Sequence, residues 1–155
     1  MLLKDYISEK GVIFATSVSS KKRALELLSE SLAQQHSDLT KNKVLDALLA
    51  REKLGSTGLG KGIAIPHCRL AEIENIYAAM LKLDEGVEFE SADGLAVNFL
   101  FCMVVPENAK DEQLQLLSGL AKLLGNDQVR QSIEKCSHAE CLYNLLCQGP
   151  ERLVS

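Results

Sequence analysis

The feature that most constrains the fold is an apolar run from Val97 to Val105, interrupted only by Asn98. It is far shorter than the roughly 20 residues that a membrane-spanning helix needs. Its valine and phenylalanine content favours a β-strand. A strand without polar alternation is covered on both faces, because an exposed face would carry polar side chains. The run therefore predicts the central strand of a sheet packed between two layers.

Helical periodicity supplies candidates for those layers. Helices are predicted over 20–35, over 40–53 with Thr40 as N-cap, and over 111–124 with Gly125 as the stop. Asn126 is expected to cap a short helix. The capping box Ser137-His138-Ala139-Glu140 opens a last helix, which Gly149-Pro150 ends.

Shorter apolar segments supply further strands. They are residues 11–16, residues 63–67 and residues 76–83, with turns expected at 84–86 and 93–94. Proline has no amide hydrogen for a central ladder, so Pro66 is expected to end the strand at 63–67. The sum predicts an α/β fold: one domain over 1–155, in three α/β/α layers around a mixed sheet of about five strands.

Composition excludes several classes of protein. Of the 155 residues 46% are hydrophobic and 25% charged, as in an ordinary globular domain. The net charge is −4, aromatic residues make up 5%, and no basic block occurs, which argues against a nucleic-acid partner. The first residues do not form a signal peptide, so a cytoplasmic location without membrane insertion is expected.

Five cysteines stand at positions 68, 102, 136, 141 and 147, without a Cys-x-x-Cys pair. These spacings do not suit a zinc site, and buried, reduced thiols are expected. Cys68 is singled out only because it follows His67. Another cluster, Lys21-Lys22-Arg23, opens the helix at 20–35, where the helix dipole disfavours positive charge. A solvated helix end is the preferred interpretation, and a partner-binding role is the alternative.

A glycine-dense loop spans residues 55–62 and holds four of the ten glycines. Backbone amides in such a loop can line an anion site. Gly55 to Lys61 matches most of a nucleotide-binding P-loop, but Gly62 replaces the Ser or Thr that holds magnesium. The context is also reversed, because this loop follows a helix and precedes a strand. The pattern therefore argues against a nucleotide site and keeps the possibility of anion binding.

His67 is the candidate for chemistry. A neutral imidazole nitrogen can attack phosphorus, and its ordinary pKa near ~6.5 leaves much of it neutral at physiological pH. Phosphoryl transfer also needs cations and donors around the phosphoryl oxygens. Candidates for this role are Arg51, Lys53, Lys61 and Arg69, with the loop amides and the hydroxyls of Ser56 and Thr57. The alternative is a surface or satisfied polar histidine. That interpretation is preferred for His36, in a polar segment between two helices, and a structural role suffices for His138, inside a capping box.

Three segments then carry a family resemblance: Arg51-Glu52-Lys53, Gly55-Ser56-Thr57-Gly58 and Gly62-Ile63-Ala64-Ile65-Pro66-His67. With these, the chain resembles the IIA domain of the mannitol/fructose class of the phosphotransferase system, in its nitrogen-regulatory branch. The resemblance extends over the whole chain, including residues 21–26 and Val104-Val105-Pro106. It implies a mixed sheet flanked by helices, in agreement with the patterns above.

The resemblance also implies roles. His67 would accept a phosphoryl group from a histidine-phosphorylated HPr-like carrier, with phosphoenolpyruvate as the ultimate source. Arg51 matches the family's active-site arginine, and Thr57 is expected beside it. Gln113 stands where many members carry a second histidine, and glutamine cannot become cationic. Ser56, Gly58, Gly60 and Lys61 are the expected anion-binding residues, and no metal or organic cofactor is implied.

Two functions fit this resemblance. The first is a regulator that signals to nitrogen and potassium physiology, with a sensor kinase or potassium transport proteins as targets. Phosphorylation would change the charge of its binding face by about −1.5 to −2. The second is a sugar-specific IIA protein that passes the group to a IIB partner. Gln113 and the absence of fused IIB or membrane segments favour the first.

Overall fold

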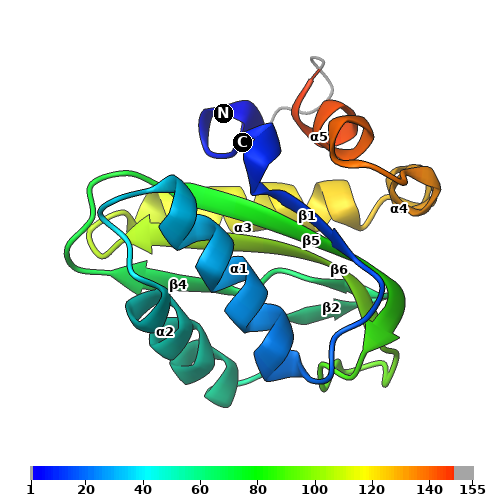
Figure 1. The fold of residues 1–155 in the computed structure, drawn as a ribbon, viewed down its shortest axis with the longest axis horizontal. Coiled ribbons are helices and arrows are strands. Elements are labelled where there is room, and N and C mark those ends of the chain that lie inside the picture. The colour runs from blue at the N-terminus through cyan, green and yellow to red at the C-terminus, as the bar shows by residue number, and fades with distance from the viewer. Residues whose placement is uncertain (1, 149–155) are drawn as a thin grey trace.

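The computed structural model describes residues 2–148 and is built on one mixed sheet (Figure 1). Its strands are β1 (Val12–Ala15), β2 (Gly58–Gly60), β3 (Ile63–Ala64), β4 (His67–Leu70), β5 (Tyr77–Val87) and β6 (Val97–Pro106). The order is β1-β5-β6-β3-β2, and β4 also pairs with β6. β6 is antiparallel to β5 and parallel to β3 and β4. The apolar run is thus the centre of the sheet, as predicted.

Alternate side chains of β6 enter two separate cores. Phe99, Phe101 and Met103 belong to one core, and Leu100 and Cys102 to the other, all of them at most 1% exposed. Helices α1 (Lys21–Gln35) and α2 (Lys41–Lys53) cover one face of the sheet. The other face is covered by α3 (Lys110–Leu124), α4 (Asp127–Lys135) and α5 (Ala139–Cys147), with the short 3-10 helices Leu3–Asp5 and Glu9–Gly11. The three-layer prediction is confirmed.

The helix boundaries follow their capping residues. Thr40 accepts a hydrogen bond from the Lys43 amide at 3.3 Å, and Asn126 accepts two from the first turn of α4. The cap predicted at Ser137 is wrong by one position, because the imidazole Nδ1 of His138 accepts from the Cys141 amide at 3.3 Å. The stop predicted at Gly149-Pro150 lies outside the described residues.

Two strand predictions need correction. The turn expected at 84–86 is wrong, because these residues belong to β5. The Glu85 amide donates to the carbonyl of Thr16, the residue after β1, at 2.9 Å. The segment 63–67 is two strands, since Pro66 interrupts the ladder and His67 begins β4. This division, together with β2 inside the glycine-dense loop, gives six strands, close to the predicted number of about five. The turn at 93–94 is confirmed by a bond from the Gly94 amide to the Ser91 carbonyl.

The expectation of five reduced thiols is also wrong. Cys136 and Cys141 form a disulfide with a Cα–Cα separation of 5.6 Å. The sequence prediction missed it because the pair lies across a helix–helix junction, where spacing alone does not place the sulfurs. Cys68, Cys102 and Cys147 are free and buried, as expected.

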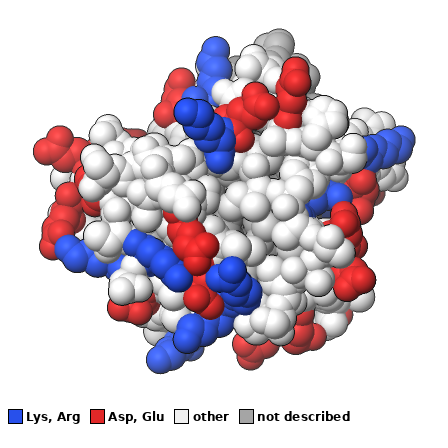
Figure 2. Space-filling view, viewed as in Figure 1, with Lys and Arg blue, Asp and Glu red and all other residues white. Residues whose placement is uncertain are grey.

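Charged side chains of both signs are interspersed on the face that carries α1 and α2 (Figure 2). Lys41 of α2 pairs with Glu26 and Glu30 of α1 at 3.7 and 3.0 Å, and Arg23 also pairs with both carboxylates. These pairs join the two helices and leave no single-sign patch over them. None of the helices within residues 2–148 is long and apolar enough to cross a membrane.

Candidate functional site

A cleft of about 1170 Å³ opens beside His67, the first residue of β4. Its walls come from α2, β4 and the first half of α3. Ladder pairing of β4 with β6, in which His67 faces Met103, holds the backbone beneath the imidazole. The cleft is lined by Ala47, Ala50, Arg51, Leu54, His67, Cys68, Arg69, Ala71, Ile73, Glu74, Glu107, Asn108, Lys110, Gln113, Leu114 and Leu117.

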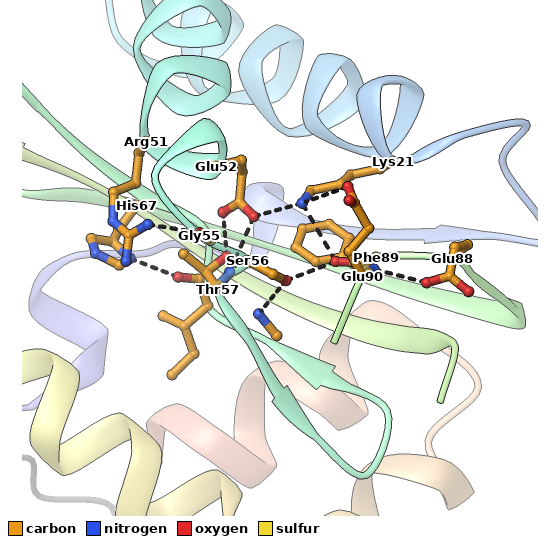
Figure 3. A network of polar contacts seen from close by, with 12 residues as sticks. Lys21, Arg51, Glu52, Gly55, Ser56, Thr57, His67, Glu88, Phe89 and Glu90 are labelled. Carbon is orange, nitrogen blue, oxygen red and sulfur yellow. Dashed lines mark hydrogen bonds and ion pairs between the residues drawn. The ribbon is translucent and has the colours of Figure 1, made fainter. Parts of the chain in front are cut away.

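The imidazole of His67 is half-buried, and a backbone carbonyl sets its tautomer. Nδ1 lies 2.8 Å from the carbonyl oxygen of Ile65 (Figure 3). A carbonyl can only accept, so Nδ1 carries the hydrogen and donates it. In the neutral ring, Nε2 therefore keeps its lone pair. The geometry thus leaves Nε2 as the ring nitrogen with a free lone pair.

The surroundings favour that neutral ring. Burial lowers the pKa of His67 below its ordinary value, and the nearby Arg51 guanidinium lowers it further. The hydrogen bond to the Ile65 carbonyl and the Glu52 carboxylate act in the opposite direction, and the net shift is downward. The uncharged ring consequently persists to lower pH than in a free imidazole.

We expect NMR titration of the His67 ring to give a midpoint below 6.5. The unfolded chain then binds more protons between the two pKa values, so this histidine's contribution to stability falls as pH drops below about 6.5. Arg51→Met should move the midpoint upward, because it removes the positive charge. A midpoint at or above 6.5 in the unchanged protein would contradict the assigned environment.

Arg51 lies in the last turn of α2, with its guanidinium beside the His67 ring (Figure 3). One guanidinium nitrogen donates to the Gly55 carbonyl at 2.8 Å. This bond fixes the side chain and satisfies a carbonyl just beyond the helix end. Because a guanidinium has five N–H donors, others remain for an anion held above the imidazole. The structure thus brings Arg51 and His67 together as the sequence indicated.

Glu52, the neighbour of Arg51, points into the protein and anchors the loop. Its carboxylate is 5% exposed and contacts Lys21 Nζ at 2.9 Å, the Thr57 amide at 3.1 Å and the Thr57 hydroxyl (Figure 3). Lys21 also lies 4.4 Å from the centre of the Phe89 ring. Lys21 is therefore not a solvated helix end, and this interpretation is corrected. Positive charge at the start of a helix is unfavourable, and this was the sequence signal that Lys21 has a buried carboxylate as its partner.

Thr57 and Ser56 consequently serve the loop and not the cleft. Thr57 is 7% exposed and its hydroxyl donates to Glu52. The Ser56 hydroxyl donates to the Phe89 carbonyl at 2.7 Å. Their expected contacts with an anion at His67 are replaced by contacts that hold residues 55–57 against the 88–90 segment.

Gly58, Gly60 and Lys61 do not reach the cleft either, because β2 and β3 form a hairpin that carries them away from it. A Cβ at Gly58 would collide with the Ser91 hydroxyl, and Gly60 has a positive φ of 91°. The Lys61 amide donates to Asp93 at 2.7 Å, and its Nζ lies 4.0 Å from Asp127. The predicted cradle of loop amides is thus corrected: these glycines build a hairpin.

The α3 wall adds residues that sequence reasoning missed. Gln113 lines the cleft as expected, together with Lys110 and Leu114. Leu114 is 65% exposed and faces the same cleft as Leu54, which is 85% exposed. No signal in the sequence pointed to them, because periodicity does not show that two helices face one cleft.

Cys68 is not part of the chemistry. Its thiol is buried, and burial raises its pKa to about 12. A thiol with that pKa is protonated and a poor nucleophile at neutral pH. Among residues 2–148 no group of three metal-ligating side chains comes together.

Comparison with known proteins identifies the class to which this fold and cleft belong. A family model described as "Phosphoenolpyruvate-dependent sugar phosphotransferase system, EIIA 2" matches residues 5–149, and the chain belongs to this family. Within it, the chain is 42% identical to a nitrogen regulatory protein of Pseudomonas aeruginosa over 127 residues, which covers 82% of each chain.

Solved structures agree. The crystal structure of nitrogen regulatory protein IIA-Ntr from Neisseria meningitidis superimposes with a TM-score of 0.86 at 38% identity, covering 92% of this chain and 97% of that one. The mannitol IIA enzyme of Escherichia coli, in a complex with its phosphorylated IIB enzyme, gives a TM-score of 0.74 at 20% identity, covering 89% and 94%. The second likeness concerns the fold alone.

Proposed function

We propose that this IIA protein accepts a phosphoryl group on Nε2 of His67 from a histidine-phosphorylated, HPr-like carrier. The observation that carries the proposal is the bond from Nδ1 to the Ile65 carbonyl, which leaves the Nε2 lone pair free. Nε2 forms the new nitrogen–phosphorus bond while the bond to the donor histidine breaks. The donor ring, protonated on its other nitrogen, leaves as a neutral imidazole, and the phosphorylated His67 ring keeps its Nδ1 hydrogen and takes over the positive charge. In this proposal the Arg51 guanidinium stabilises the negative charge of the phosphoryl oxygens.

The rim of the cleft suits a protein partner better than a small substrate. Leu54 and Leu114 are exposed apolar side chains on opposite walls, next to the cations Arg51 and Lys110. Apolar anchors beside charged groups are typical of protein–protein contacts. We propose this rim as the contact surface for the phosphocarrier.

The output we propose is regulatory, directed to nitrogen and potassium physiology through partners such as a sensor kinase or potassium transport proteins. The nitrogen regulatory names of the relatives support this branch. Gln113 supports it as well, because a glutamine on the cleft wall cannot supply a cation for fast onward transfer. The alternative is a sugar-specific IIA protein, and rapid transfer to a cognate IIB domain would establish it.

The test is incubation with labelled phosphoenolpyruvate and the upstream relay proteins. We expect an adduct that is labile in acid and stable in base, as phosphohistidine is. NMR of the adduct should place the phosphorus on Nε2. A protein that stays unlabelled, or that carries the group on another residue, would refute the proposal.

Arg51→Met should lower the rate of phosphoryl acceptance by about 100- to 1000-fold, the usual effect of removing one electrostatic donor. Arg51→Lys should fall between this variant and the unchanged protein, because it keeps the charge but loses the planar fork. Rapid-quench labelling measures the rates. Arg69→Met, on the same cleft but without an assigned contact to His67, is the matched control. Equal rates for Arg51→Met and Arg69→Met would refute the role of Arg51.

A further inference from the structure

The junction between α4 and α5 holds a pair of cysteines that the phosphoryl chemistry does not use. Cys136 is the C-cap residue of α4, and Cys141 lies in the first turn of α5. Their sulfurs are joined, with a Cα–Cα separation of 5.6 Å that is typical of disulfides. No group of three potential ligands forms here among the described residues, which argues against a metal site.

The two thiols differ in access. Cys136 is 4% exposed, whereas Cys141 is half-buried and follows the exposed residues Ser137 and His138. Cys141 also lies at the N-terminus of α5, where the helix dipole stabilises a thiolate. Cys141 is therefore the sulfur that an external reagent reaches, and Cys136 is the internal sulfur that completes the bond.

We propose that Cys136 and Cys141 form a reversible thiol–disulfide pair, oxidised by disulfides of low molecular mass such as glutathione disulfide. The Cys141 thiolate attacks one sulfur of the oxidant, forming a mixed disulfide and releasing one small thiol. The Cys136 thiolate then attacks the Cys141 sulfur and releases the second small thiol. Two cysteine thiols are oxidised, one disulfide is reduced to two thiols, and the two protons end on the released thiols.

The position of the pair indicates what the bond controls. Leu142 and Leu146 of α5 are fully buried in the core, where α5 packs against β1 and the two 3-10 helices. The bond ties the first turn of α5 to the end of α4, so it limits how far α5 can detach. The His67 cleft is lined by α2, β4 and α3, not by α4 or α5. Oxidation should therefore change stability and leave phosphoryl acceptance unchanged, independently of the proposed function.

The experiment equilibrates the whole chain with reduced or oxidised glutathione, alkylates it under denaturing conditions, and counts the modified thiols by intact mass. We expect five alkylated cysteines after reduction and three after oxidation, the protected pair being Cys136 and Cys141 by peptide mapping. Reduction should lower Tm by roughly 4–8 °C, the effect of a short closed loop in a chain of this size.

Matched variants separate the pair from general effects. Cys141→Ser should remove the dependence of Tm on redox state, and Cys147→Ala, on the same helix, should preserve it. Failure of the pair to become protected in glutathione disulfide would overturn the proposal. So would a bond that reduced glutathione does not open, or a Tm that is the same in both states.

Discussion

His67→Gln should abolish phosphoryl acceptance, the largest functional effect expected in this protein. Glutamine can still hydrogen-bond near the Ile65 carbonyl, but its amide nitrogen has no available lone pair with which to attack phosphorus. The measurement is the acid-labile label that the upstream relay transfers. The loss should be complete, because none of the other described residues that line the cleft is a histidine.

The controls use the other two histidines. His36 stacks on Tyr77 with ring centroids 3.8 Å apart, so His36→Phe keeps the stacking. His138 caps α5 through its Nδ1, so His138→Asn keeps a capping acceptor. Both variants should be labelled like the unchanged protein. Full labelling of His67→Gln, or loss of label in either control, would contradict the assignment to His67.

Glu52→Ala should destabilise the protein by about 3–5 kcal/mol, the usual effect of removing one partner of a buried ion pair. The carboxylate is 5% exposed, and the Lys21 side chain opposite it is 16% exposed. Without Glu52, the ammonium and the Thr57 amide and hydroxyl lose their shared acceptor. The free energy of unfolding in urea measures the effect.

A double variant tests whether the Lys21 charge, left with only the exposed Glu90 carboxylate at 3.7 Å, is the cause. Glu52→Gln combined with Lys21→Met removes both charges, so its loss should be smaller than that of Glu52→Ala. Glu26→Ala, in the more exposed network between α1 and α2, should change stability by less than about 1 kcal/mol. If Glu52→Ala proved as mild as Glu26→Ala, the buried pair would not be what holds the loop.

Much of the fold was predictable because periodicity and caps report local structure. The run from 97 to 105 indicated a strand between two layers, and alternate side chains of β6 do enter two cores. Asn126 and Thr40 began their helices as predicted, since a capping side chain acts within its own turn. The errors at 84–86 and at 63–67 arose where pairing with another strand, and not local pattern, decides the ends of a strand.

The site was predictable in part. His67 and Arg51 were identified from residue type and resemblance, and the structure places them together. The predicted anion cradle at Gly58, Gly60 and Lys61 was wrong, because closeness along the chain was taken for closeness in space. The β2–β3 hairpin uses these residues and turns them away from His67.

The sequence by itself determined the central strand, the helices around it and the histidine capable of phosphoryl chemistry, because hydrophobic pattern and side-chain chemistry are local properties. Only the tertiary structure decided which nitrogen of His67 is free, which acid neutralises Lys21 and which cysteines meet. Lys21 and Glu52 meet only on folding, and even the contacts between near neighbours, His67 with Ile65 and Cys136 with Cys141, depend on the path of the folded backbone. Their energies depend on burial and distance, which no spacing along the chain specifies.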